Sequence, residues 1–144
     1  MSAIRFGPHA IPSKDDPENA IETLVGRGYD ACEVDFGGGF WMGWDYAERL
    51  GEPAREAGIT LSVHAPIPAI LGHTQRGKKL NMAIGMLDHS AGIAVACGAE
   101  VVVLHPGFLA GRERADAIAA VVEQLGEMRE RLEGKRRAVP FGSR

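Results

Sequence analysis

Short apolar runs alternate with longer amphipathic segments along this chain, and Gly and Pro residues separate them. The apolar runs predict strands, and the amphipathic segments predict the helices between them. We expect strands over residues 4–7, 31–36, 60–64 and 101–105, with a further strand beginning at 138–141. We expect a first helix that opens at residues 15–18 and ends at 26–28, and further helices over 44–57, 78–96 and 112–132.

The polarity of the expected strands indicates how they are buried. Residues 31–36 alternate apolar and acidic side chains, which places Glu33 and Asp35 on one side of a strand. Residues 101–105 begin with four consecutive apolar residues, which is typical of a strand buried on both faces. Because single helices separate the strands, we expect all of them to be parallel.

Parallel strands with intervening helices form either an open doubly wound sheet or a barrel. The turn after the first strand matches neither phosphate-loop pattern, GxGxxG or GxxxxGK[ST], and Gly37-Gly38-Gly39 precedes Phe40-Trp41 rather than a helix start. These observations favour an α/β fold of the (β/α)8 TIM-barrel type. Such barrels need about 250 residues, so we expect a truncated barrel of about four and a half βα units, with residues 1–144 as the N-terminal half of a single domain.

Composition narrows the class of protein. The chain has 144 residues, of which 45% are hydrophobic and 24% charged, and no apolar run is long enough for a membrane span. We therefore expect a globular protein without a membrane partner, and the absence of a secretory signal predicts a cytoplasmic location. A net charge of −3 does not indicate a generally basic nucleic-acid-binding protein, although a local basic face is compatible with it. Cys32 and Cys97 lie among apolar residues and are expected to be reduced core thiols.

Two histidines stand where parallel α/β folds carry their chemistry. His64 and His105 each end an expected strand, so both imidazoles are expected at the same mouth, where they suit zinc and also manganese or iron. Each could instead be a hydrogen-bonded structural histidine. His89 falls within an expected helix and is expected at the surface, and His73 lies in the loop after residues 60–64, where it is expected to be solvated although it could reach the mouth.

Several segments, in order along the chain, resemble the N-terminal half of the endonuclease IV family of apurinic/apyrimidinic endonucleases, which have a xylose-isomerase-like barrel. The His-Pro-Gly that follows the fourth expected strand is the most specific of them. The segments are Gly7-Pro8-His9, Glu33-Val34-Asp35-Phe36, Leu61-Ser62-Val63-His64-Ala65-Pro66, Leu71-Gly72-His73 and Val103-Leu104-His105-Pro106-Gly107.

The resemblance implies a metal-dependent nuclease of base-excision repair. The family cuts DNA on the 5′ side of an abasic site with a trinuclear zinc cluster. The resemblance implies that His64 and His105 are two ligands of one zinc. Their bridging partner would be a Glu at the end of strand five, where this sequence instead reads Phe141-Gly142-Ser143-Arg144. Hydrolysis by clustered metals needs ions about 3.5–4 Å apart. Two imidazoles alone would hold at most one labile ion, so we expect the chain alone to be inactive.

Abasic double-stranded DNA is the partner that the resemblance implies. Phe40 and Trp41, in the loop over residues 37–44, could wedge into the base stack, while Trp44 is equally suited to core packing. Basic side chains expected on the catalytic face could contact phosphates. They are Arg76, Lys78, Lys79, Arg112 and Arg114. The basic run at residues 135–137 precedes an expected strand and is expected to be solvated on the opposite face.

Two other functions stay open. The first is a sugar isomerase or epimerase of the same superfamily, although these enzymes usually take their metal from carboxylates on later strands, whereas this chain offers His64 and His105. The second is a non-catalytic half-barrel. Such a sheet would leave its edges and half of the interior exposed, which predicts self-association.

Overall fold

Burial alternates strictly along the first two strands of the computed structural model, which describes residues 4–138 and the side chains of residues 4–134. In β1 (Ala31–Asp35) Cys32 and Val34 are buried, and in β2 (Thr60–His64) Leu61 and Val63 are buried. The residues between them, including Glu33 and Asp35, are only half-buried. One face of the sheet therefore carries the core, and the other is polar and partly open.

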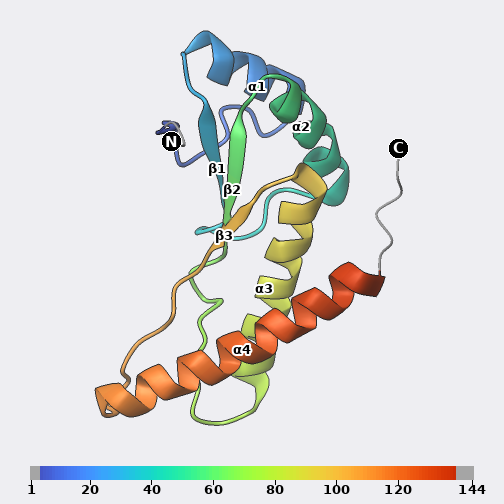
Figure 1. Cartoon of the computed structure of the whole chain (residues 1–144). Helices are drawn as coiled ribbons and strands as arrows, with labels where there is room; N and C mark the ends of the chain where they lie inside the picture. The colour runs from blue at the N-terminus through green and yellow to red at the C-terminus, as the bar shows by residue number, and fades with distance from the viewer. Residues whose placement is uncertain (1–3, 139–144) are drawn as a thin grey trace. The chain divides into compact units, whose positions relative to one another are not determined.

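The strands form a parallel sheet in the order β1-β2-β3, where β3 is Val101–Val103 (Figure 1). Asp35 pairs with His64 in the register of β1 and β2, and His64 pairs with Val103 in that of β2 and β3. The expectation of parallel strands is confirmed. Asp35, His64 and Val103 therefore lie side by side at the carboxyl ends of the strands, where barrels carry their sites.

The four helices begin and end close to the expected positions. They are α1 (Pro17–Gly26), α2 (Trp44–Glu56), α3 (Lys78–Cys97) and α4 (Arg114–Ala138). Asp16 caps α1 by accepting a hydrogen bond from the Asn19 N–H, as a carboxylate before Pro17 predicts. The expected helix over 112–132 is longer than predicted, because α4 extends through the basic run at 135–137 to Ala138. The expected strand at 138–141 therefore begins on the last residue of a helix, and the rest of it lies outside the described residues.

The chain divides into two compact units, which we describe separately. The first unit contains residues 1–67 and 89–104, and so holds the sheet, α1, α2 and the C-terminal part of α3. Its core is formed by apolar side chains from all of these elements, among them Leu24, Val34, Leu50, Val63 and Ile93. The second unit contains residues 68–88 and 105–144, and so holds the N-terminal part of α3 and α4.

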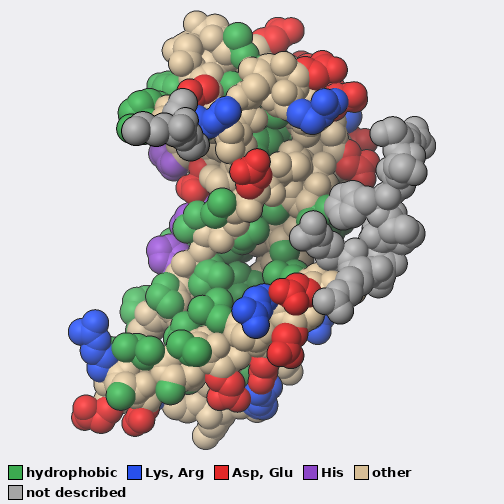
Figure 2. Space-filling view, viewed as in Figure 1, with side chains coloured by type: hydrophobic (Ala, Val, Ile, Leu, Met, Phe, Trp, Pro, Cys, Tyr) green, Lys and Arg blue, Asp and Glu red, His purple; other side chains and the backbone are tan. Residues whose placement is uncertain are grey.

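α4 buries one stripe of side chains and leaves another at the surface. Ala117, Gln124 and Met128 are buried, whereas Ile118 and Val122 are 51% and 63% exposed. Figure 2 shows hydrophobic side chains at the surface over the N-terminal part of this helix. The second unit therefore presents an apolar surface of the kind that proteins use for association.

The expected strand over residues 4–7 is not formed. Its main chain still runs beside β1, because the Phe6 carbonyl accepts hydrogen bonds from the Asp30 and Ala31 N–H groups and the Pro8 carbonyl accepts one from Glu33. Pro8 has no N–H to donate, so a regular ladder cannot continue through it. The prediction was right about the neighbour of β1 and wrong about the strand itself.

The expectation that the strand at 101–105 is buried on both faces is also wrong. β3 covers only Val101–Val103, and Val101 and Val103 are 56% and 38% exposed, while Val102 packs against the core of the first unit. Among the described residues no strand follows β3, so nothing supplied by a further strand covers these two valines.

Among the described helices, only α3 is long and apolar enough to cross a membrane by length and composition. Core helices of soluble proteins meet the same criterion. The C-terminal part of α3 contributes Ile93, Ala94 and Cys97 to the core of the first unit, which is the behaviour of a core helix.

Candidate functional site

A carboxylate and an imidazole meet at the carboxyl ends of β1 and β2. Asp35 Oδ1 lies 3.5 Å from His64 Nδ1, and the two side chains are 35% and 19% exposed. The same Asp35 oxygen accepts a 2.7 Å hydrogen bond from the Gly37 N–H, which fixes the carboxylate at the turn that follows β1. At this distance the carboxylate can pair with the imidazole when the ring is protonated, and a carboxylate beside a histidine is a common feature of metal-binding and acid–base sites.

The polar face continues one step back along the same strands. Glu33 pairs with Ser62 in the register, and both side chains are half-buried. Because strand side chains alternate, Glu33 and Asp35 share the open face, as their spacing predicted. In the first unit this face carries the carboxylates of Glu33 and Asp35, the hydroxyls of Thr60 and Ser62 and the imidazole of His64, and at its β3 edge the exposed Val101 and Val103.

His105 begins the second segment of the second unit, and it is exposed in the stretch after β3. Gly107 in this stretch has φ +115°, and a Cβ there would lie 2.7 Å from the Leu71 carbonyl oxygen. The stretch therefore packs against the loop that carries Gly72 and His73, and only glycine permits this approach. Two of the segments that carry the endonuclease IV resemblance are in contact within the second unit.

The donors predicted for a metal are divided between the units, with His64 in the first and His105 in the second. Their pairing on one ion stays a prediction. Within the described residues, no group of three or more His, Cys, Asp or Glu side chains could hold a metal ion. The donors have the right chemistry for zinc, but those described here do not complete a site.

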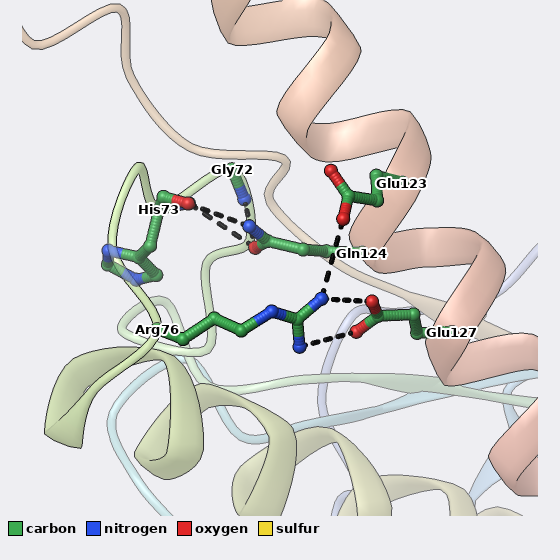
Figure 3. A network of polar contacts seen from close by, with 6 residues as sticks. All are labelled: Gly72, His73, Arg76, Glu123, Gln124 and Glu127. Atoms are coloured by element: carbon green, nitrogen blue, oxygen red, sulfur yellow. Dashed lines mark hydrogen bonds and ion pairs between the residues drawn. The ribbon is translucent and has the colours of Figure 1, made fainter.

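Gln124 is a site residue that the sequence interpretation missed. This buried α4 side chain accepts hydrogen bonds through Oε1 from the N–H groups of Gly72 (2.8 Å) and His73 (3.3 Å), and its Nε2 donates to the His73 carbonyl (2.7 Å) (Figure 3). One signal could have found it: Gln124 interrupts the apolar stripe that also contains Ala117, Val121 and Met128. A polar residue on a buried stripe usually has a specific hydrogen-bonding role.

The basic residues predicted to contact phosphates differ in their surroundings. Arg76 forms ion pairs with Glu123 and Glu127, which raise the pKa of its guanidinium above the ordinary value (Figure 3). Lys78 and Lys79 are exposed at the start of α3. Arg112 donates to the Leu109 and Phe108 carbonyls, at 3.1 and 3.3 Å. Their contact with DNA stays a prediction, and Arg76 would have to exchange its carboxylate partners for a phosphate.

The aromatic side chains after β1 are packed to different degrees. Trp41 is half-buried, donates through Nε1 to the Asp35 carbonyl at 2.9 Å, and has its ring 5.5 Å from that of Tyr46. Trp41 therefore anchors the loop that begins at Asp35. Phe40 is 40% exposed, with its ring 4.9 Å from that of Phe36. Of the two predicted wedge residues, Phe40 is the one with exposed surface to offer.

His89 is not a surface residue, in contrast to the expectation. Its half-buried ring lies 4.4 Å from that of Phe40 and 5.3 Å from that of Trp44, in edge-on contacts. Gly92, three residues along α3, explains why Trp44 lies so close, because a Cβ there would be 2.2 Å from the Trp44 ring. The sequence did not indicate that this helix face meets the aromatic loop.

Both cysteines are buried and free, as expected for core thiols. Burial raises the pKa of the Cys32 thiol to about 12, and it also raises the pKa of Cys97. Burial therefore keeps both thiols protonated near neutral pH, which disfavours them as nucleophiles.

Comparison with known proteins agrees with the parallel α/β fold. Residues 21–137 match the family described as xylose isomerase-like TIM barrel. The chain belongs to this family. A probable endonuclease 4 of Latilactobacillus sakei is 31% identical over 122 residues, which are 74% of this chain and 40% of that protein. The uncharacterized protein MJ0133 of Methanocaldococcus jannaschii is 27% identical over 129 residues, which are 89% of this chain and 46% of that protein.

Two solved structures have a similar fold. A D-tagatose 3-epimerase-like protein superposes with a TM-score of 0.68 at 19% identity, covering 91% of this chain and 49% of its own. The D-psicose 3-epimerase of Clostridium cellulolyticum H10, solved with D-tagatose, gives 0.65 at 15% identity, covering 83% and 44%. The chain spans less than half the length of these relatives. Its α/β structure is therefore a partial TIM barrel, as the strand count predicted.

Proposed function

We propose that this xylose isomerase-like chain is the N-terminal half of a metal-dependent phosphodiesterase that cuts DNA on the 5′ side of abasic sites. The observation that carries the proposal is the Asp35–His64 pair at the ends of β1 and β2, followed in the sequence after β3 by His105-Pro106-Gly107. The similarity to probable endonuclease 4 supports the proposal, because it covers three quarters of this chain.

In this proposal the chain supplies oriented imidazoles. Asp35 would orient the His64 ring, and the packing of Gly107 against Leu71 fixes the stretch that carries His105. Zinc, or manganese or iron in its place, would activate water and stabilise charge on the phosphate when bound. The remaining ligands would come from the part of the barrel that corresponds to the other half of the relatives. In this proposal the protein would act on abasic double-stranded DNA in the cytoplasm.

The surfaces for DNA in this proposal come from the loops after β1 and β2. Phe40 offers exposed apolar surface to an unstacked base pair, and Lys78 and Lys79 offer positive charge to phosphates. Unstacking costs least at a damaged site, which would favour abasic DNA over intact duplex.

The test is an incision assay with a 5′-labelled duplex that carries one tetrahydrofuran abasic analogue, in the presence of Zn²⁺. Three samples are assayed. The first is the 144-residue chain, the second is the segment of the Latilactobacillus sakei relative that lies outside the matched region, and the third is a mixture of the two. We expect incision only in the mixture, only at the analogue, and on its 5′ side. An intact duplex is the matched control, and a mixture that binds both duplexes equally without incision contradicts the proposal.

A ketose epimerase is the second candidate, favoured by the superposition on two structures of that kind and by Glu33 and Asp35 on the open face. A carboxylate there could move a proton next to a carbonyl group. The same mixture is therefore incubated with D-tagatose and D-fructose. Epimerisation without DNA incision would replace the nuclease proposal with this one.

A further inference from the structure

The amide of Gln124 pairs with the main chain of a loop in the way a neighbouring strand would. Its oxygen accepts from two successive N–H groups, Gly72 and His73, and its nitrogen donates to the His73 carbonyl. The side chain is only 7% exposed. A buried amide with three such bonds costs much to replace, because an apolar substitute leaves the peptide groups without partners.

Two glycines allow close packing around the same segment, residues 71–73. Gly72 has φ +81°, and a Cβ there would lie 2.6 Å from Val121 Cγ2, on the turn of α4 before Gln124. Gly107, with φ +115°, approaches the Leu71 carbonyl from the stretch after β3. α4, residues 71–73 and residues 106–107 therefore interlock within the second unit, and no larger residue fits at either glycine without a shift.

The residue that this interlock fixes is His73. Its N–H and its carbonyl are both bound by Gln124, and its ring points away from that side chain (Figure 3). The charges nearby in sequence are of two kinds. Arg76 is neutralised by Glu123 and Glu127, whereas Lys78 and Lys79 are exposed. Lys78 and Lys79 follow His73 by five and six residues and are exposed, so they offer positive charge to an anion that contacts this part of the chain.

We propose that Gln124 is a positioning residue that presents His73 to a phosphate of the DNA backbone. This inference rests on the proposed function. Without Gln124 the main chain at Gly72 and His73 would have to be ordered when DNA binds, and that ordering would weaken the affinity. With Gln124 in place, this segment is already ordered in the folded chain, so DNA binding loses less conformational entropy.

The first arm of the test needs no DNA. Gln124→Met keeps the length of the side chain and removes all three hydrogen bonds, Gln124→Glu keeps the acceptor oxygen, and Val121→Ala loosens the same helix face without removing a bond. Amide hydrogen exchange at Gly72 and His73 is measured by NMR. We expect exchange to rise by about tenfold or more in the Met variant, less in the Glu variant, and little in Val121→Ala. Equal increases in Met and Val121→Ala, or no increase, would overturn the positioning role.

The second arm measures affinity for the tetrahydrofuran duplex by fluorescence anisotropy. We expect His73→Ala and Gln124→Met each to weaken binding by about tenfold, and the double variant to be no weaker than the singles, because Gln124 acts through His73. Additive losses overturn the link between the two residues. Affinity is measured in the same mixture as incision. If the wild-type mixture does not prefer the abasic duplex, the proposed function fails. If it does and His73→Ala binds as tightly as the wild type, the phosphate contact alone fails, and the exchange measurements decide separately whether Gln124 orders Gly72 and His73.

Discussion

Asp35 makes two interactions that different substitutions separate. One of its oxygens accepts the Gly37 N–H, which shapes the turn after β1, and the same oxygen faces His64 Nδ1. An amide retains an acceptor for the Gly37 N–H but lacks the charge that faces the imidazole. A methyl group has neither.

We therefore expect Asp35→Asn to change the free energy of unfolding by less than about 0.5 kcal/mol, and Asp35→Ala to lower it by about 1–2 kcal/mol, because the Gly37 N–H loses its partner. Urea unfolding measures both. In the mixed incision assay, both variants are expected to lose about 10- to 100-fold in rate. This is the usual loss when a carboxylate that orients a metal-binding histidine is replaced. Full activity in Asp35→Asn would mean that the carboxylate serves the turn alone.

Cys32 predicts a loss of stability at alkaline pH. Burial raises the pKa of its thiol to about 12, whereas the thiol of an unfolded chain ionises near pH 8.5. Ionisation thus favours the unfolded state above about pH 8.5, and the contribution is complete below that pH and is lost as the pH rises toward 12. Tyr46, whose pKa burial also raises to about 12, acts in the same direction. Urea unfolding at pH 7.5 and 10 should show a fall for the wild type and a smaller fall for Cys32→Ala; equal falls would contradict it.

At the scale of elements, α3 holds two glycines in different surroundings. A Cβ at Gly92 would meet the Trp44 ring at 2.2 Å, whereas a Cβ at Gly85 would meet nothing within 4 Å. Alanine in an open helix position stabilises by up to about 1 kcal/mol, because it lowers the entropy of the unfolded chain. At Gly92 the same gain is opposed by displacement of the indole.

We expect Gly85→Ala to raise the melting temperature and Gly92→Ala to lower it, with a difference of about 1–2 kcal/mol in the free energy of unfolding. Tryptophan fluorescence should shift in Gly92→Ala alone, because Trp44 must move. If both variants are stabilised to the same degree, Trp44 does not pack on α3 as described here.

The helices and strands differ in how well the sequence predicts them. Period-two burial and helix caps are local signals, so β1, β2, α1 and α2 were predicted to within a residue or two, and the parallel order followed from the connections. Exposure of Val101 and Val103 could not be predicted, because burial of a strand depends on what covers it. The same holds for His89 and Gln124, whose partners lie 49 and 51 residues away in the sequence.

At the scale of the whole molecule, two apolar surfaces predict self-association of this partial barrel. One is the open face at Val101 and Val103, and the other is the stripe of Ile118 and Val122 on α4. Both are solvent-exposed in the single chain, and a second copy could cover either.

We expect the chain to sediment as a concentration-dependent mixture of monomer and dimer or larger species. Ile118→Lys combined with Val122→Lys should shift the mixture toward monomer, whereas Ala119→Lys, at an exposed position of the same helix, should not. A monomer at all concentrations in analytical ultracentrifugation would contradict the prediction for the wild type.

The central claim is that His64 and His105, on two successive strand ends of a TIM-barrel half, carry the chemistry of a phosphodiesterase. The most direct test is the single-turnover rate of abasic-duplex incision by mixtures that contain His64→Asn, His105→Asn or Ser62→Ala, the last of which changes the same face of β2 away from the strand end. We predict losses of about 100-fold or more for each histidine variant and a change of less than about threefold for Ser62→Ala. Histidine variants that cut as fast as the wild type, with far-UV circular dichroism unchanged, would contradict the account.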